Sequence, residues 1–335
     1  MDVSVVMPAY NAEENIVNSI ESVINQTFKN FELIIVDDGS KDNTLKICRE
    51  YENKYPNIKV IHQKNGGEAA ARNTGIKNAS GKYIMFLDSD DTYKPDMVSR
   101  MFEKAENETP DWVLCAFSTI ADKKVKTIKL QNTRNLNTHK EVLQGLYPFV
   151  EINGLINTWN KIYSRRIITE NKIEFLPEFE MGVDHIFNLN YIEHCSNCGF
   201  IDEPLYNYYI QNSFLSNKYK LYEFEQRLKR LEIVKKLYLS NNMDTSPLNW
   251  QYIKGAYAHF FMLFHKDCGL NFSKKTEEVR KVLKNEMVIS GIKNITPQGA
   301  MQKSLTAVIK TGNPAIILCF SYIVNYVHRI LRKRK

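Results

Sequence analysis

The sequence has no apolar run long enough for a confident membrane span and no pattern that favours disulfides. Its six cysteines are scattered among 335 residues, mostly in apolar contexts, so we expect reduced, buried thiols. There is no apolar leader of the signal-peptide type, because the chain enters an expected strand at Val3–Pro8, and this predicts a cytosolic, unprocessed N-terminus. The length suits one large domain and a smaller second region.

Several catalytic and binding signatures are also missing. Gly66-Gly67 is not followed by the Lys-Ser/Thr pair of a phosphate-binding P-loop, and there is no nucleophile elbow. The pair Cys195-x-x-Cys198 lacks the second pair that a structural zinc site needs, so we interpret it as a loop with reduced thiols. These absences argue against P-loop, serine-hydrolase and zinc-ribbon functions.

Acidic residues are missing from the last stretch of the chain. Residues 300–335 contain seven Lys or Arg and no Asp or Glu. This tail therefore accounts for the net charge of +7, and the formal charges of all other residues sum to about zero. An anionic partner is therefore to be expected at this tail alone, and we expect no nucleic-acid partner.

The first third of the chain alternates between short β-rich apolar runs and segments of helical periodicity. This pattern predicts a parallel, doubly wound α/β sheet of the Rossmann-like type. The expected strands are Val3–Pro8, Phe31–Val36, Ile58–His62, Tyr83–Leu87 and Trp112–Phe117, and the expected helices are about 12–26, 44–55, 69–73 and 95–106.

The rest of the chain is less regular and then becomes helical. We expect a charged hairpin at Ile120–Leu130, short helices at Glu141–Leu146 and His185–His194, and paired strands within Phe200–Tyr209. Three helices are expected after residue 221, at about 222–239, 250–264 and 276–284. We predict a sheet domain over 1–215, a helical region over 216–299 and a tail over 300–335.

Polar or Gly/Pro segments follow four of the expected strands. In a parallel sheet these carboxyl ends meet at one edge, where ligands bind. Asp88, Asp90 and Asp91 come directly after Tyr83–Leu87, and clustered carboxylates suit a hard divalent cation such as Mg²⁺ or Mn²⁺. Taken alone, this acidic stretch could equally be a solvated turn. The convergence of four such segments on one edge favours a ligand site.

These segments resemble those of the inverting, metal-dependent nucleotide-sugar glycosyltransferases of family 2, which have the GT-A fold. The resemblance covers about residues 1–215. It is carried by Pro8-Ala9-Tyr10-Asn11, Asp37-Asp38-Gly39-Ser40, Asn65-Gly66-Gly67, Ala71-Arg72-Asn73, Asp88-Ser89-Asp90-Asp91, Trp159-Asn160-Lys161 and Gly182-Val183-Asp184.

The resemblance implies a role for each part of the edge. Asp90 would bind the metal, Mn²⁺ or Mg²⁺, with Asp88 beside it on the metal or the ribose, and Asp91 would support them. Asp38 would accept a hydrogen bond from the uracil of a UDP-sugar, while Asp37 supports the turn. The remaining donor-binding residues would be Pro8, Ala9, Tyr10, Asn65, Gly67, Arg72, Ser89 and Trp159.

Each assignment has a structural alternative. Asp37 and Asp38 could form an Asx-turn before Gly39. Arg72 would contact the diphosphate or orient an acid of the Asp88–Asp91 cluster, but it could also be a surface arginine in a salt bridge. Trp159 resembles an aromatic residue near the sugar and could equally be a core residue.

Transfer to a hydroxyl group needs a general base opposite the leaving phosphate. By resemblance that base is Asp184, although the family often has Glu-Asp here and this chain has Val183-Asp184. Asp184 could instead cap the helix that follows, or do both. His185 is the second candidate. A single in-line displacement would invert the anomeric centre.

Residues Pro314–Leu331 are strongly apolar, with a narrow polar stripe of Ser321, Asn325, His328 and Arg332. The segment falls short of the about 20 apolar residues that span a membrane, so we predict a helix in the plane of an anionic membrane surface. The alternatives are a helix packed on the preceding ones or a homodimer contact.

The sequence therefore predicts a cytoplasmic enzyme peripherally associated with the inner face of the cell membrane. It would move a sugar from a UDP-sugar to a polyprenyl-diphosphate-linked glycan. The Gln-x-x-Arg-Trp motif and multiple spans of processive synthases are absent, which favours one sugar per acceptor. The alternatives are transfer to teichoic acid or protein, and a non-catalytic sugar-nucleotide-binding scaffold.

Overall fold

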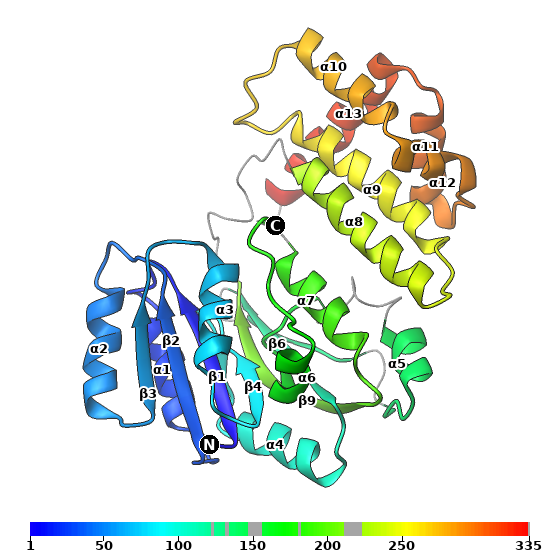
Figure 1. The fold of residues 1–335 in the computed structure, drawn as a ribbon. Coiled ribbons are helices and arrows are strands. Elements are labelled where there is room, and N and C mark those ends of the chain that lie inside the picture. The colour runs from blue at the N-terminus through cyan, green and yellow to red at the C-terminus, as the bar shows by residue number, and fades with distance from the viewer. Residues whose placement is uncertain (122–123, 131–133, 147–155, 180–181, 211–222, 334–335) are drawn as a thin grey trace. The chain divides into compact units, whose positions relative to one another are not determined.

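The computed structural model describes residues 1–121, 124–130, 134–146, 156–179, 182–210 and 223–333. The chain divides into two compact units, Met1–Asn212 and Ser213–Lys335, which we describe separately (Figure 1). The predicted boundary between 215 and 216 lies outside the described residues.

The first unit is built on a mostly parallel sheet, as the sequence predicts. The strands in the described residues are β1 (Val3–Ala9), β2 (Phe31–Asp37), β3 (Ile58–His62), β4 (Tyr83–Phe86), β5 (Thr92–Tyr93), β6 (Trp112–Ala121), β7 (Lys124–Ile128), β8 (Lys161–Ser164) and β9 (Cys198–Tyr209). Their order is β3-β2-β1-β4-β8-β6-β9-β5, with β7 paired to β6. β1 lies between β2 and β4, parallel to both, so their carboxyl ends share one edge.

Helices cover both faces of this sheet. They are α1 (Ile16–Ile24), α2 (Thr44–Lys54), α3 (Glu68–Asn78), α4 (Met97–Asn107), α5 (His139–Leu146), α6 (Arg165–Glu170) and α7 (Val183–Ile192). Every residue of β1 is buried, as expected for a strand covered on both faces. Side chains of α1, α2 and α4 share one core with alternate residues of β1, whereas α3 packs on the opposite face.

The face that α3 covers also carries α7. Phe86 of β4 meets Phe187 of α7 edge to face, with 5.8 Å between ring centroids. Gly75 lets α3 approach β1 closely, because a Cβ there would lie 2.2 Å from Cγ1 of Val6. This contact fixes the helix that carries Arg72 against the strand that ends at Ala9.

The prediction of paired strands within Phe200–Tyr209 is wrong, because β9 is one continuous strand parallel to β6. Its register shifts where Ile201 pairs with Cys115 and Pro204 with Ala116, so Asp202 and Glu203 bulge out and are exposed. A bulge with two charged residues and a proline reads in the sequence like a hairpin turn. The sequence also gave no signal for β5 or α6.

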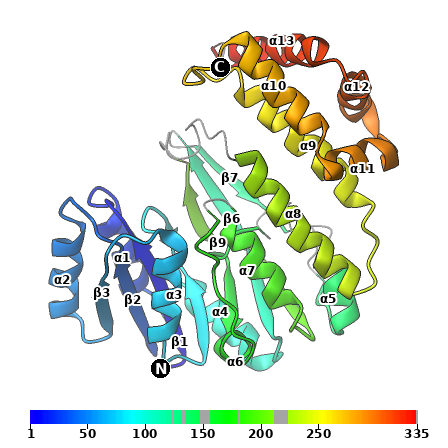
Figure 2. The same ribbon diagram turned by 45° about the horizontal axis from the view of Figure 1, so that its top comes forward.

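The second unit is entirely helical in its described part. Its helices are α8 (Glu223–Ser240), α9 (Pro247–Met262), α10 (Phe272–Leu283), α11 (Glu286–Asn294), α12 (Gly299–Lys310) and α13 (Pro314–Lys333). Figure 2 shows α10 and α13 beside α9, and both α9 and α10 contact α13. Within the described ranges we find no helix whose length and apolar character would suffice to cross a membrane. α11 was not predicted.

Candidate functional site

Asp38 joins the loops that follow β1, β2 and β3. Its backbone N–H donates to the carbonyl of Ala9 over 2.8 Å. One carboxylate oxygen accepts from Gln63 Nε2 and the Gly66 N–H at 2.7 and 2.9 Å, and the other from the Gly67 N–H at 2.7 Å. A buried carboxylate with three donors rigidly positions the backbone around it.

The neighbouring acid, Asp37, is also buried and supports the turn. Its Oδ2 lies 2.7 Å from His62 Nδ1 and accepts from the Ser40 N–H at 3.4 Å. Gly39 has a φ of +75°, and a Cβ there would lie 2.9 Å from the backbone nitrogen of Asn65. A glycine is therefore required for the Asp37–Ser40 turn to pack on the loop of Asn65 and Gly67.

The segment after β1 lies at the same edge. Pro8 and Ala9 are buried as the last residues of the strand, whereas Tyr10 is 47% exposed. Asn11 has a φ of +48°, and its N–H donates to Ser40 Oγ at 3.0 Å. An aromatic ring thus stands exposed beside the Asp38 loop, where a planar base could pack.

Arg72 is the electrostatic centre of the site. Its Nη1 donates to Asp184 Oδ1 and its Nη2 to Asp88 Oδ1, both at 2.7 Å, although the side chain is only 2% exposed. Glu68 lies one helical turn earlier and is largely exposed. Its Oε1 lies 2.7 Å from Arg72 Nη2, so Glu68 is a third partner of the guanidinium. Burial opposes the charge of Arg72, but the three carboxylates outweigh it and raise its pKa further. Arg72 is therefore a buried ion-pair centre and not a surface arginine.

The Asp88–Asp91 turn contains two kinds of acid. Asp91 is buried and accepts from Tyr206 Oη at 2.7 Å and from the Tyr209 N–H at 2.8 Å, so it ties the turn to β9. Burial, reinforced by Asp88 and Asp90, raises the pKa of Asp91 to about 9. Asp88, Ser89 and Asp90 remain partly exposed. Asp91 is thus a structural acid, and Asp88 and Asp90 are available to a ligand.

The acids that remain available suit a hard divalent cation. Burial raises the pKa of Asp90, and it raises that of Asp88 to about 6 although Arg72 opposes the shift. Both shifts mean that negative charge here is insufficiently compensated by the protein. No three His, Cys, Asp or Glu side chains in the described part of the chain gather closely enough to form a metal cage. A cation at Asp90 and Asp88 would therefore need further oxygen ligands, such as those of a diphosphate.

Asp184 lies in the first turn of α7 and faces Arg72. The N-cap position is taken by Gly182, which adopts a left-handed conformation, so Asp184 is the second residue of the helix and not its cap. Its Oδ2 accepts from the N–H and the hydroxyl of Thr158 at 3.3 and 3.2 Å. Both carboxylate oxygens are thus held while 17% of the side chain stays exposed. His185, the other candidate base, is buried.

A buried polar network holds the turn that carries Thr158. Lys161 Nζ donates to the carbonyl of Asn157 and, at 2.7 Å, to Asn160 Oδ1. Asn188 of α7 donates to the carbonyls of Ile156 and Asn157 at 3.1 Å. No pattern in the sequence indicates a role for Thr158 or Asn188. The Trp159-Asn160-Lys161 segment was the only signal, and it pointed to the tryptophan.

This network predicts a pH-dependent stability that depends on Lys161. Burial lowers its pKa from an ordinary 10.5 to about 7, so the unfolded chain binds more protons between these values. The free energy of unfolding of the wild type, minus that of Lys161→Met, should therefore rise as the pH increases from about 7 towards 10. Urea unfolding at neutral and alkaline pH measures this. A difference that stays constant with pH would show that burial does not lower the pKa of Lys161 in the folded chain.

Trp159 is 3% exposed and forms part of the core. Its ring stacks on Tyr206 and on Tyr208, with centroids 4.2 and 5.7 Å apart. Tyr208 is the exposed member of this stack, and nearby Asp91, Asp90 and Asp88 help burial to raise its pKa. The aromatic surface open to a ligand beside the acidic turn is therefore that of Tyr208, with Trp159 behind it. The sequence missed Tyr208 because only the stack distinguishes it from other tyrosines.

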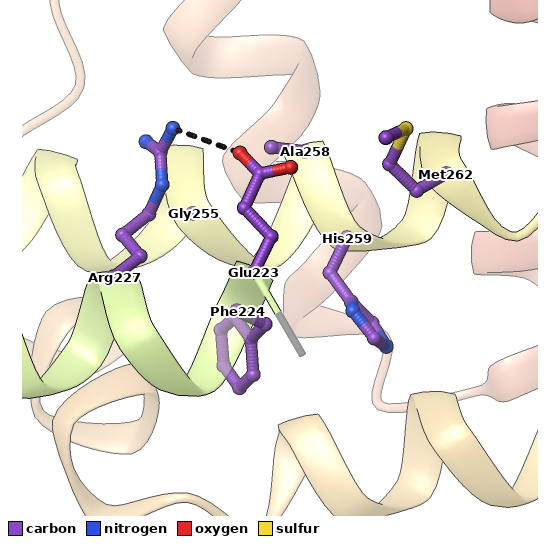
Figure 3. Close-up of a pocket in the computed structure, with 7 residues that line it drawn as sticks. All are labelled: Glu223, Phe224, Arg227, Gly255, Ala258, His259 and Met262. Carbon is purple, nitrogen blue, oxygen red and sulfur yellow. Dashed lines mark ion pairs between the residues drawn. The ribbon is translucent and has the colours of Figure 1, made fainter. Parts of the chain in front are cut away.

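The helical unit has a pocket of its own, which Figure 3 shows between α8 and α9. It is lined by Glu223, Phe224, Arg227, Gly255, Ala258, His259 and Met262. Arg227 Nη2 lies 3.8 Å from Glu223 Oε1, so the charges on its wall compensate one another. None of the predicted site residues lines it, and we assign it no role.

Comparison with known proteins finds a family model and relatives that this chain resembles. Residues 4–170 match the model of the family described as glycosyl transferase family 2. The chain is 34% identical over 230 residues to the putative glycosyltransferase EpsH of Bacillus subtilis. This alignment covers 68% of this chain and 66% of that protein. It is 31% identical over 198 residues to the poly(ribitol-phosphate) beta-glucosyltransferase of Bacillus spizizenii, covering 57% of this chain and 29% of that protein. The chain thus spans less than two thirds of these relatives.

The fold is also that of a solved structure. S. aureus TarS 1–349, in a crystal structure in complex with UDP, superposes with a TM-score of 0.66 and 18% identity over all of this chain and 92% of that one. The same TarS segment has been crystallised with UDP-GlcNAc. At this level of identity the likeness concerns the fold, which is the predicted GT-A fold followed by a helical region.

Proposed function

Because the chain belongs to glycosyl transferase family 2, we propose that it transfers a sugar from a UDP-sugar to a hydroxyl group of a glycan acceptor. The observation that carries this proposal is the double ion pair of Arg72, which fixes Asp88 and Asp184 on either side of one guanidinium. One acid belongs to the donor side of the reaction and the other to the acceptor side. Their common anchor on Arg72 would set the position of the reacting bond between them.

The donor would bind along the carboxyl ends of β1, β2 and β4. Tyr10 would pack on the uracil, and the Asp38 loop, with Asn65 and Gly67, would border the base and ribose. Asp38 uses both of its oxygens within the protein, so its contact with the uracil would share an acceptor that Gln63 or a glycine N–H already uses. The UDP and UDP-GlcNAc complexes of TarS support a uridine nucleotide here.

Asp90, with Asp88, would hold a divalent cation of the Mn²⁺ or Mg²⁺ type. When bound, such a cation supplies Lewis-acid stabilisation of the charge that develops on the leaving diphosphate. Ser89 would border this group. Tyr208, supported by Trp159, would offer its ring to the sugar.

Asp184 would act as the general base that takes the proton from the acceptor hydroxyl. Thr158 and Arg72 hold its two oxygens in a fixed orientation, and an accessible part of the carboxylate remains to accept the proton. Attack from the side opposite the diphosphate would invert the anomeric centre, so an α-linked donor would give a β-linked product.

For the acceptor we propose a polyprenyl-diphosphate-linked glycan used in surface polysaccharide synthesis, which would place the reaction at the inner face of the cell membrane. A second candidate is teichoic acid, favoured by the similarity to the poly(ribitol-phosphate) beta-glucosyltransferase. Transfer to a protein has no specific support. A non-catalytic scaffold is disfavoured, because it would have no use for the buried network that orients Asp184.

Isothermal titration of UDP tests the donor and metal assignments. We expect UDP to bind more tightly in the presence of Mn²⁺. In Asp90→Ala, we expect the affinity for UDP in the presence of Mn²⁺ to be at least about tenfold lower than in the wild type. Asp202→Ala is a matched control, since Asp202 is an exposed acid that pairs with Lys129 at 3.3 Å. A metal-dependent gain that survives in Asp90→Ala would disprove the metal role.

A further inference from the structure

The last helix of the second unit places Ser321 and Asn325 inward. Ser321 is fully buried, and Asn325 Nδ2 donates to the carbonyl of Phe261 at 3.1 Å. Ile317 and Leu318 complete the buried side of α13, which packs on α9 and α10. Two residues of the polar stripe predicted from the sequence, Ser321 and Asn325, therefore face protein, while the side chains of the other two, His328 and Arg332, lie outside the described part.

The opposite side of α13 is apolar and exposed. Tyr322, Ile323 and Tyr326 are 55, 53 and 56% exposed. With 3.6 residues per turn, positions three and four apart share one face, so the exposed residues form a continuous stripe. We define the α13 face as Ile316, Cys319, Tyr322, Ile323, Tyr326 and Val327.

A contiguous apolar surface of this kind marks an interaction site. Charge and composition indicate which partner it fits. Residues 300–335 carry seven basic and no acidic residues, so two copies of the tail would repel one another, whereas an anionic surface would attract it. Lys275 lies 4.8 Å from the ring centroid of Phe264, which in turn contacts Tyr322, so a cation also borders the face.

The tyrosines suit the boundary between water and lipid. Tyr322 and Tyr326 stack with centroids 6.3 Å apart, and each combines an apolar ring with a polar hydroxyl. Such side chains favour the headgroup region of a bilayer, where one end is apolar and the other is hydrated. The surface of a second copy of the chain would not offer this change from an apolar to a hydrated environment.

We propose that the α13 face is a membrane-docking surface that inserts side-on into a bilayer containing anionic phospholipid. Internal packing holds the polar side of the helix on α9 and α10 and leaves the apolar side for the acyl chains. The folded unit therefore docks as a whole, without a helix that spans the membrane. This inference is independent of the sugar and acceptor proposed above, since lipid binding needs neither.

Vesicle flotation of the full chain without nucleotide tests this proposal. Wild type should float with phosphatidylcholine–phosphatidylglycerol vesicles and less with pure phosphatidylcholine. Ile323→Asp/Val327→Asp should weaken binding by at least about tenfold at low and at high salt, because two apolar side chains can no longer be buried. The control is Leu239→Asp, an exposed apolar residue on α8, which should float like wild type.

A second measurement does not depend on how well the aspartate variant folds. In Cys268→Ser, Cys319 is the exposed thiol among the described residues, and an environment-sensitive fluorophore attached to it should shift to the blue on adding anionic vesicles. An unchanged spectrum, or flotation of the double variant equal to wild type, overturns the proposal. Wild type that ignores vesicles but forms a dimer, which the double variant dissociates, assigns the face to a second copy instead.

Discussion

Replacing Asp184 with asparagine is expected to lower kcat by about 10²–10⁴-fold while leaving UDP-sugar affinity within a few-fold of wild type. The amide keeps the shape of the side chain and an oxygen that can accept from Arg72, but it cannot take a proton from the acceptor. The loss should therefore fall on the chemical step and not on donor binding. Steady-state rates with saturating donor, together with calorimetric donor affinities, separate the two.

Glu178→Gln serves as the matched control, since Glu178 is an exposed acid in the turn shortly before α7. Its rate should equal that of wild type. If Asp184→Asn kept most of its activity, the base would have to be sought elsewhere, and the network of Thr158, Lys161 and Asn188 would be only structural.

Arg72→Met is expected to destabilise the first unit by about 3–5 kcal/mol and to remove activity. Removing one partner of a buried ion pair leaves its carboxylates uncompensated, and in this case both Asp88 and Asp184 lose their cation. For a unit of this size the melting temperature should fall by roughly 10 °C. Arg72→Lys should recover only part of the lost stability, because the single ammonium group of lysine cannot reproduce the two separate Nη donors of the guanidinium.

Arg49→Met provides the comparison. Arg49 is exposed and pairs with Glu52 on the surface, so its loss should cost less than about 1 kcal/mol. Thermal unfolding followed by circular dichroism measures all three variants. A melting temperature of Arg72→Met close to that of Arg49→Met would contradict the account of Arg72 as the anchor of the site.

The edge of the sheet was predictable because order along the chain determines where parallel strands end. Once β1, β2, β3 and β4 are recognised, the segments after them must meet, whatever their side chains do. The contacts made there were not predictable. Arg72 and Asp184 are 112 positions apart, and no local pattern indicates that one guanidinium holds both Asp88 and Asp184.

The tail shows the same limit. Periodicity correctly placed Ser321 and Asn325 on one stripe, but which side of a helix faces its own protein depends on the partner helix. Here the carbonyl of Phe261 supplies an acceptor for Asn325, so this residue of the stripe turns inward. Trp159 likewise depends on Tyr206 and Tyr208, which contribute the stack from β9.

Release of nucleotide from a panel of UDP-, GDP- and TDP-sugars, with and without Mn²⁺, tests the central proposal most directly. We predict that the wild type releases UDP from at least one UDP-sugar in a metal-dependent way, and that with an acceptor present Asp184→Asn slows this release by about 10²–10⁴-fold. Metal-independent release, or turnover confined to GDP- or TDP-sugars, would contradict the account.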